Sequence, residues 1–241
     1  MSATGSGATH AGAHPTDDAS ALSRLEERLP TLLSVIAGMV DLIGFLTLGN
    51  IFTAHITGNL VVFAAVLARG RPLNLAQALA IPVFILAVAA IWLLARASGR
   101  RGPGLARLLL LIQFLLLAGL WIFSVIASPS ASPHGLMAGI AVMIAVSAMA
   151  CQYALLRLAV PGALSTAVMT GNLTNSVLSL LDILSPTGRL MEGDTERLKR
   201  SLRLLFGFLL GCVVAAAAVT LLGDWAWSFP AVLAGVAVAL R

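Results

Sequence analysis

Long apolar runs, separated by short polar segments, follow one another along the chain from about residue 30 onward. An apolar helix needs roughly 17–25 residues to cross the hydrocarbon core of a bilayer. We predict a transmembrane helix in each of six runs, at 31–49, 74–95, 105–127, 135–156, 201–222 and 225–240. The last run is the shortest, and Trp225 and Trp227 mark its interfacial end. The pattern predicts an all-α polytopic membrane protein.

Two shorter apolar stretches each follow a polar octapeptide that occurs twice, as TAHITGNL at 53–60 and as TAVMTGNL at 166–173. The stretches are 60–68 and 173–184. Helices over them would be about 14 and 18 Å long at about 1.5 Å per residue, roughly half of the ~30 Å hydrocarbon core. Either eight helices cross the membrane, or six cross and two half-helices enter the bilayer and return.

The distribution of charge distinguishes these two arrangements. With a cytoplasmic N-terminus, six crossings place thirteen of the fifteen Lys and Arg residues on the cytoplasmic side, whereas eight crossings place ten there. Cytoplasmic loops carry an excess of Lys and Arg, so we predict six crossings with both termini in the cytoplasm. The units 30–128 and 129–241 then begin on opposite sides of the membrane. They would be inverted repeats, as in many transporters, whereas eight crossings would make them parallel.

Composition supports a membrane protein. Hydrophobic residues make up 59% of the chain and charged residues 10%, and the mean hydropathy is +0.98. A soluble domain carries about 25% charged residues. The net charge of +5 does not indicate nucleic-acid binding, because the basic residues lie at the ends of apolar runs. Residues 1–29 are polar and lack a signal-peptide pattern, and we predict a disordered cytoplasmic tail there.

Thr-Gly-Asn stands just before each short apolar stretch, at 57–59 and 170–172. These residue types are unfavourable inside helices and favourable at helix starts and turns. They predict a break followed by a half-helix whose first N–H groups lack partners and face a polar solute. Two such N-termini would meet near the bilayer midplane. Alternatively, the motif only allows close helix packing, which is also the interpretation of the GxxxG segments at 135–139 and 207–211.

Three further polar residues lie at membrane depth near the motifs. Asp41 lies in the middle of the first apolar run, where a carboxylate is costly and marks a functional site by default. We predict that it binds a cation or carries a coupling proton. The alternative is a structural hydrogen bond to Thr57, Asn59 or His55. Gln152 stands in the corresponding region of the second unit, and His55 either titrates near neutral pH or serves as a hydrogen-bonded interior side chain.

Catalytic and cofactor motifs are absent from the sequence. There is no nucleophile–base pair in a suitable context, no metal-ligand spacing, no Walker loop and no dinucleotide-binding glycine pattern. We therefore predict that the protein is not an enzyme and has no cofactor and no metal site.

The residues around the two motifs resemble the YoaK family of bacterial membrane proteins, known as domain of unknown function 1275. The resemblance covers about residues 31–240. It rests on Gly38-x-x-Asp41, Phe52-Thr53-Ala54 and Thr57-Gly58-Asn59-Leu60 in the first unit, and on Gln152, Ser165-Thr166 and Met169-Thr170-Gly171-Asn172 in the second. It implies a polytopic protein of the bacterial inner membrane, and it implies no particular substrate or mechanism.

These features predict a secondary transporter or channel for a small polar solute or ion, with a proton carried by Asp41 as the simplest coupling. The candidate substrate-binding residues are Asp41, His55, Thr57, Gly58, Asn59, Gln152, Thr170, Gly171 and Asn172. The expected partners are the lipid bilayer and the solute, without nucleic acid and with a homo-oligomer as a further option. The alternative function is a non-transporting assembly factor or sensor that acts through the cytoplasmic loop 185–200.

Overall fold

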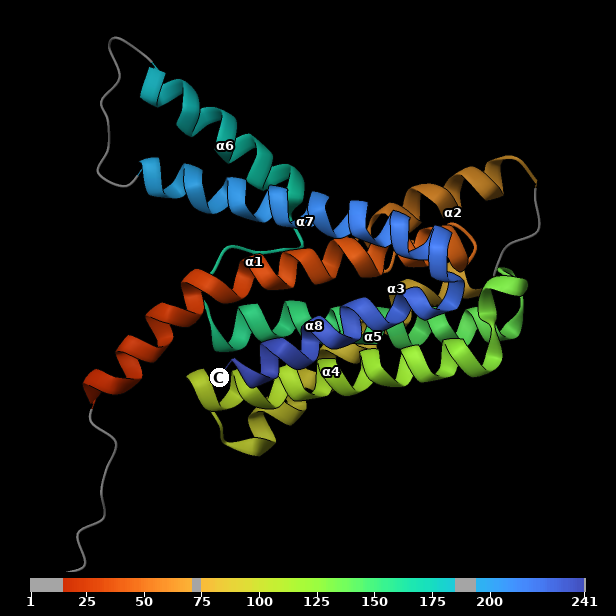
Figure 1. Ribbon diagram of the computed structural model, residues 1–241, viewed down its shortest axis with the longest axis horizontal. Helices are drawn as coiled ribbons and strands as arrows, with labels where there is room; N and C mark the ends of the chain where they lie inside the picture. Colours follow the sequence, from red (N-terminus) through yellow and green to blue (C-terminus); the bar gives the residue numbers. More distant parts are fainter. Residues whose placement is uncertain (1–14, 71–74, 185–193, 241) are drawn as a thin grey trace, which may run out of the picture.

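Helices make up all regular structure in the part of the chain that the computed structural model describes, residues 15–70, 75–184 and 194–240 (Figure 1). The α-helices are α1 (Pro15–Thr47), α2 (Gly58–Ala68), α3 (Leu75–Ser98), α4 (Gly102–Ala127), α5 (Leu136–Ala159), α6 (Met169–Leu184), α7 (Asp194–Leu222) and α8 (Ser228–Ala239). The 3-10 helices η1 (Pro129–Ala131) and η2 (Gly223–Trp227) lie between them. The predicted all-α class is confirmed for these residues.

Several helices are long and apolar enough to cross a membrane, which makes the chain a multi-pass membrane protein by length and composition. In the described residues there are five such segments: Leu29–Thr47, Leu75–Ser98, Gly102–Ala127, Leu136–Ala159 and Thr195–Ala239. The last contains α7, η2 and α8, and the chain reverses direction at η2 (Figure 1). The sixth predicted crossing is not established by this criterion. α8 has 12 residues, and such a helix is about 18 Å long, whereas the hydrocarbon core is ~30 Å thick.

The predicted disordered tail is wrong in part. α1 begins at Pro15, so residues 15–29 are helical, whereas residues 1–14 lie outside the described residues. The segment starts with Pro, Thr and two Asp residues and continues mainly with Ala, Ser, Leu, Glu and Arg. These residue types favour helix initiation and continuation. High polarity alone was therefore a poor indicator of disorder at this position.

Helices of the two predicted units interleave (Figure 1). In the first unit α1 packs along α7 of the second, and in the second unit α5 packs against α3 and α4 of the first. α8 packs against α4, α6 against α7, and α2 against α3. The short helices α2 and α6 point toward opposite ends of the bundle (Figure 1).

The backbones of α1 and α7 touch at small residues. A Cβ atom added to Gly38 would meet the carbonyl oxygen of Phe208, and one added to Gly211 would meet the carbonyl oxygen of Val35, both closer than real Cβ atoms come. Small residues permit this approach between membrane helices. Close packing at 207–211, which the sequence predicted, is confirmed, and its partner is α1.

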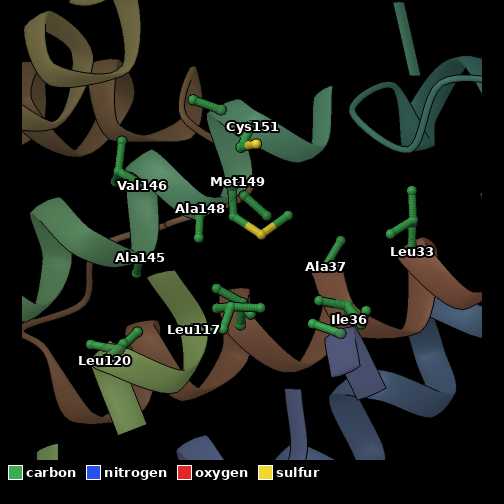
Figure 2. Close-up of a cluster of buried hydrophobic side chains, with 14 of the residues drawn as sticks. Leu33, Ile36, Ala37, Leu117, Leu120, Ala145, Val146, Ala148, Met149 and Cys151 are labelled. Carbon is green, nitrogen blue, oxygen red and sulfur yellow. The ribbon is translucent and has the colours of Figure 1, made fainter. Parts of the chain in front are cut away.

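The hydrophobic core lies between α1, α4 and α5 (Figure 2). Leu33 of α1, Leu117 of α4 and Met149 of α5 are each 0% exposed. Large apolar side chains also lie on the outside of the bundle, where Leu86 of α3 and Leu209 of α7 are exposed. A bundle with apolar side chains both inside and outside is suited to a lipid environment.

Two non-helical segments interrupt the bundle. We call residues 48–57 the first break and residues 160–168 the second break. The first break opens with Gly49 and Asn50, whose φ angles are +81° and +59°. A Cβ atom on Gly49 would lie 2.7 Å from the Pro133 carbonyl oxygen, so both the turn and its close contact require glycine there.

Candidate functional site

Asp41 of α1 holds the first break. Its Oδ1 accepts hydrogen bonds from the backbone N–H groups of Thr53, Ala54 and His55, at 2.8, 2.8 and 3.3 Å. Its Oδ2 lies 2.6 Å from Nδ1 of His55. The residue is 5% exposed. Both oxygens are therefore engaged within the protein, and of the three structural partners considered for Asp41, His55 is the one it contacts.

The two TGN copies close their breaks with the same bond. In the first, Asn59 Nδ2 donates to the Phe52 carbonyl oxygen at 2.7 Å, and the Phe52 N–H donates to Asn59 Oδ1 at 2.9 Å. In the second, Asn172 Nδ2 donates to the Ser165 carbonyl oxygen at 3.0 Å. Each amide reaches back seven residues. Both asparagines are buried, so their side chains stabilise the breaks and are turned away from solvent.

Three backbone N–H groups at the start of α2 have partners. Those of Gly58, Asn59 and Leu60 donate to carbonyl oxygens three residues earlier, at 2.9, 3.1 and 3.2 Å. The prediction of unpaired donors facing a solute is therefore wrong for the first break. The preceding residues form turns that bring their own carbonyls to these donors, and the sequence gives no direct sign of this.

The second motif occupies a different place in its helix. α6 begins at Met169, so Thr170 and Gly171 lie inside its first turn, and the Asn172 N–H donates to the Val168 carbonyl oxygen at 3.0 Å. The prediction of an unpaired donor is wrong for Asn172 as well.

The two motif threonines are not brought into the polar interior. Thr57 precedes α2 without a capping side-chain bond, and both Thr57 and Thr170 are exposed. Neither therefore joins the buried residues of the candidate site.

Gln152 of α5 performs at the second break a role that parallels the role of Asp41 at the first. Its Nε2 donates to Thr166 Oγ1 at 3.2 Å and to the Leu33 carbonyl oxygen at 2.9 Å. Thr166 is the counterpart of Thr53 in the repeated octapeptide. The Oε1 of Gln152 accepts a bond from Gln113 Nε2 at 2.7 Å. The position predicted to replace the acid thus contacts the matching residue through an uncharged amide.

Tyr153 connects this cluster to the first break, and the sequence analysis missed it. Its hydroxyl donates to the Ala54 carbonyl oxygen at 2.7 Å. Gln152 and Tyr153 are adjacent on α5, so neighbouring residues of one helix bond to the two breaks. The sequence did offer one indication: Tyr153, the single tyrosine of the chain, directly follows Gln152, which had been identified as a polar residue at membrane depth.

The TGN copies themselves are not hydrogen-bonded to each other in the described part of the chain. α2 packs against α3 and α6 against α7, and the two helices diverge in Figure 1. The connection between the breaks runs through α5.

A cavity of about 1150 Å³ lies beside the first break, between α2, α3 and the beginning of α5. Gly49 and Asn50 of the break form part of its wall. Among the described residues no group of three or more His, Cys, Asp or Glu side chains could hold a metal ion. The loop 185–200 of the alternative function falls largely on residues 185–193, which lie outside the described residues.

Comparison with known proteins confirms the resemblance. The family described as "Protein of unknown function (DUF1275)" matches residues 29–240. A curated relative, the "UPF0700 transmembrane protein YoaK" of Bacillus subtilis (strain 168), is 46% identical over 41 residues, which is 17% of this chain and 18% of the relative. The match therefore spans less than a fifth of that relative's length. No solved structure matches the chain.

Proposed function

The chain belongs to the DUF1275 family, and on this premise we propose that it is a secondary transporter or channel for a small polar solute. The proposed protein has six crossing helices and two half-helices arranged as inverted repeats. In this proposal the two breaks, and the buried polar residues that bond to them, form the transport pathway.

Matching contacts in the two units support the repeat. The first helix of each unit packs on the third helix of the other, α1 on α7 and α5 on α3. Asp41 accepts a hydrogen bond from the backbone N–H of Thr53, and Gln152 donates one to the hydroxyl of Thr166, the residue at the matching position of the octapeptide. The half-helices α2 and α6 point toward opposite ends (Figure 1), and opposite directions are what inverted units produce.

The distribution of cations supports the orientation. Arg96, Arg107 and Arg157 lie near the ends of α3, α4 and α5 that meet at one end of the bundle, and Arg69 follows α2 at the other end. Because cytoplasmic loops are rich in Lys and Arg, we assign the first end to the cytoplasm. We further propose that the protein lies in the bacterial inner membrane.

The observation that carries the proposal is the set of bonds on Asp41. One carboxylate accepts three N–H groups of the first break and contacts His55, whose side chain is 33% exposed. A carboxylate that gains a proton loses acceptor capacity. A proton arriving through His55 would therefore loosen the first break, and the solute would pass when the break opens. Irregular backbone at membrane depth is tolerated where it lines such a path.

A liposome assay tests the proposal. The purified protein is reconstituted in liposomes that contain a pH-sensitive dye, and amino acids, organic acids and sugars are added outside in turn. We expect at least one solute to produce a proton movement that Asp41→Asn abolishes in a protein that still assembles. Asp182→Asn is the matched control, because Asp182 is an exposed acid on the other half-helix, and it should retain the flux. Equal proton movement with Asp41→Asn, or the absence of solute-driven proton movement across the panel, would contradict coupling through Asp41.

A further inference from the structure

The half-helix α2 is poorly packed for an apolar element. Of its 11 residues, Asn59 is the buried one, and Val61 is 72% exposed. α2 packs against α3, and the cavity of about 1150 Å³ separates it from α5. This volume slightly exceeds the ~300–1,000 Å³ typical of ligand pockets. An apolar helix beside a cavity of this size gains stability if apolar groups fill the space.

The cavity is polar at one end and apolar at the other. Asn50, Arg69, Gln77 and His134 line it, and they lie where α1 and α2 have ended and where α3 and α5 begin. One to two turns farther into α5 the wall consists of apolar residues such as Met143, and Val62 faces the same cavity from α2. A ligand that fits both ends must have a polar head and an apolar body.

The charge at the polar end favours an anionic head. No Asp or Glu lines the cavity, and Arg69 forms no ion pair with a described residue. Gln77, whose side chain ends in an amide, is 6% exposed and lines the cavity near the same end. A carboxylate would provide acceptors for both the guanidinium and the amide N–H groups.

We propose that this cavity binds a long-chain carboxylate from the membrane, with its head at Arg69 and Gln77 and its hydrocarbon chain along α2 and α5. The contacts of the ligand would complete the packing of α2. This inference does not depend on the proposed transport function, because it concerns binding and is tested without a flux measurement.

Photocrosslinking tests this inference. The protein in nanodiscs of zwitterionic phospholipid is irradiated with a palmitic acid analogue that carries a diazirine on its chain, and labelled peptides are identified by mass spectrometry. We expect adducts on peptides that contain 61–66 and 139–143. Unlabelled palmitate should compete for them and hexadecanol, which lacks the charge, should not. Adducts confined to the lipid-facing surfaces of α3 and α7, or equal competition by hexadecanol, would overturn the proposal.

Two variants and one control sharpen the test. Arg69→Gln should weaken competition by palmitate about tenfold, the effect of losing one charge-assisted hydrogen bond. Arg96→Gln removes the same charge at the opposite end of α3, where Arg96 stacks on Trp92, and should leave competition unchanged. Ala65→Trp places a large side chain in the cavity from the loosely packed α2 and should prevent labelling of 139–143. Labelling that persists in Ala65→Trp would overturn the proposal even if Arg69→Gln failed to fold.

Discussion

At the scale of single residues, the first break depends on one buried acceptor. Asp41 and Gln152 could be singled out from the sequence because polar side chains at membrane depth are costly and need partners. The identity of those partners could not be derived. Tyr153 donates to Ala54, 99 positions away, and hydropathy carries no information on such a pairing. The TGN motif likewise predicted a break, but whether its N–H groups were free depended on turns formed by the preceding residues.

Replacement of Asp41 by alanine should destabilise the protein strongly. The N–H groups of Thr53 and Ala54, both at 2.8 Å from Oδ1, would lose their acceptor inside a buried site. Each unpaired buried donor costs about 1–3 kcal/mol, so we expect a loss of at least about 2 kcal/mol in the free energy of unfolding. The measurement is an unfolding titration with sodium dodecyl sulfate in mixed micelles. Asp41→Asn keeps an oxygen acceptor and should lose less stability; a wild-type free energy for Asp41→Ala would show that the carboxylate does not hold the break.

At the scale of helices, hydropathy located every described α-helix, because each corresponds to an apolar run. It was less successful at their ends. The run predicted as a crossing at 225–240 begins with η2, a turn in which Trp227 is fully buried. Of the predicted tail, the described residues 15–29 form the first part of α1. Helix ends depend on local turns and tertiary contacts, which average hydropathy does not describe.

The contact between α1 and α7 gives a prediction at this scale. Gly211→Ala would bring a methyl group against the carbonyl oxygen of Val35, and the two helices would have to separate. Overpacking of this kind typically costs about 1–3 kcal/mol. Gly119→Ala in α4 is the matched control, because its Cβ would meet nothing within 4 Å, and alanine favours a helix over glycine by up to about 1 kcal/mol. In the same detergent unfolding titration, the free energy of unfolding of Gly211→Ala should be well below that of Gly119→Ala. The reverse order would exclude tight backbone contact between α1 and α7.

At the scale of the whole molecule, the interleaved helices connect the two breaks to one framework. α5 contributes Gln152 to the second break and Tyr153 to the first, so a shift of α5 would act on both. The sequence suggested two repeats from the doubled octapeptide and from charge. It could not suggest that helices of one unit pack against helices of the other. An apolar run indicates a helix that lies among lipid or protein, but it does not indicate which helix will be its neighbour.

Labelling of single cysteines decides how the chain crosses the membrane. With six crossings and a cytoplasmic N-terminus, Ser132 lies outside and Arg100 inside, whereas eight crossings exchange these two positions. Thr195 is cytoplasmic in both arrangements and serves as the control. All three residues are exposed, so a cysteine at each position should react with a maleimide that cannot cross membranes, while the native Cys151 is buried and Cys212 half-buried. In intact cells we expect Ser132→Cys to be labelled, whereas Arg100→Cys and Thr195→Cys should react only after the cells are lysed. Labelling of Arg100→Cys in intact cells, with Ser132→Cys protected, would instead establish eight crossings and parallel units, and the proposed inverted repeat would have to be abandoned.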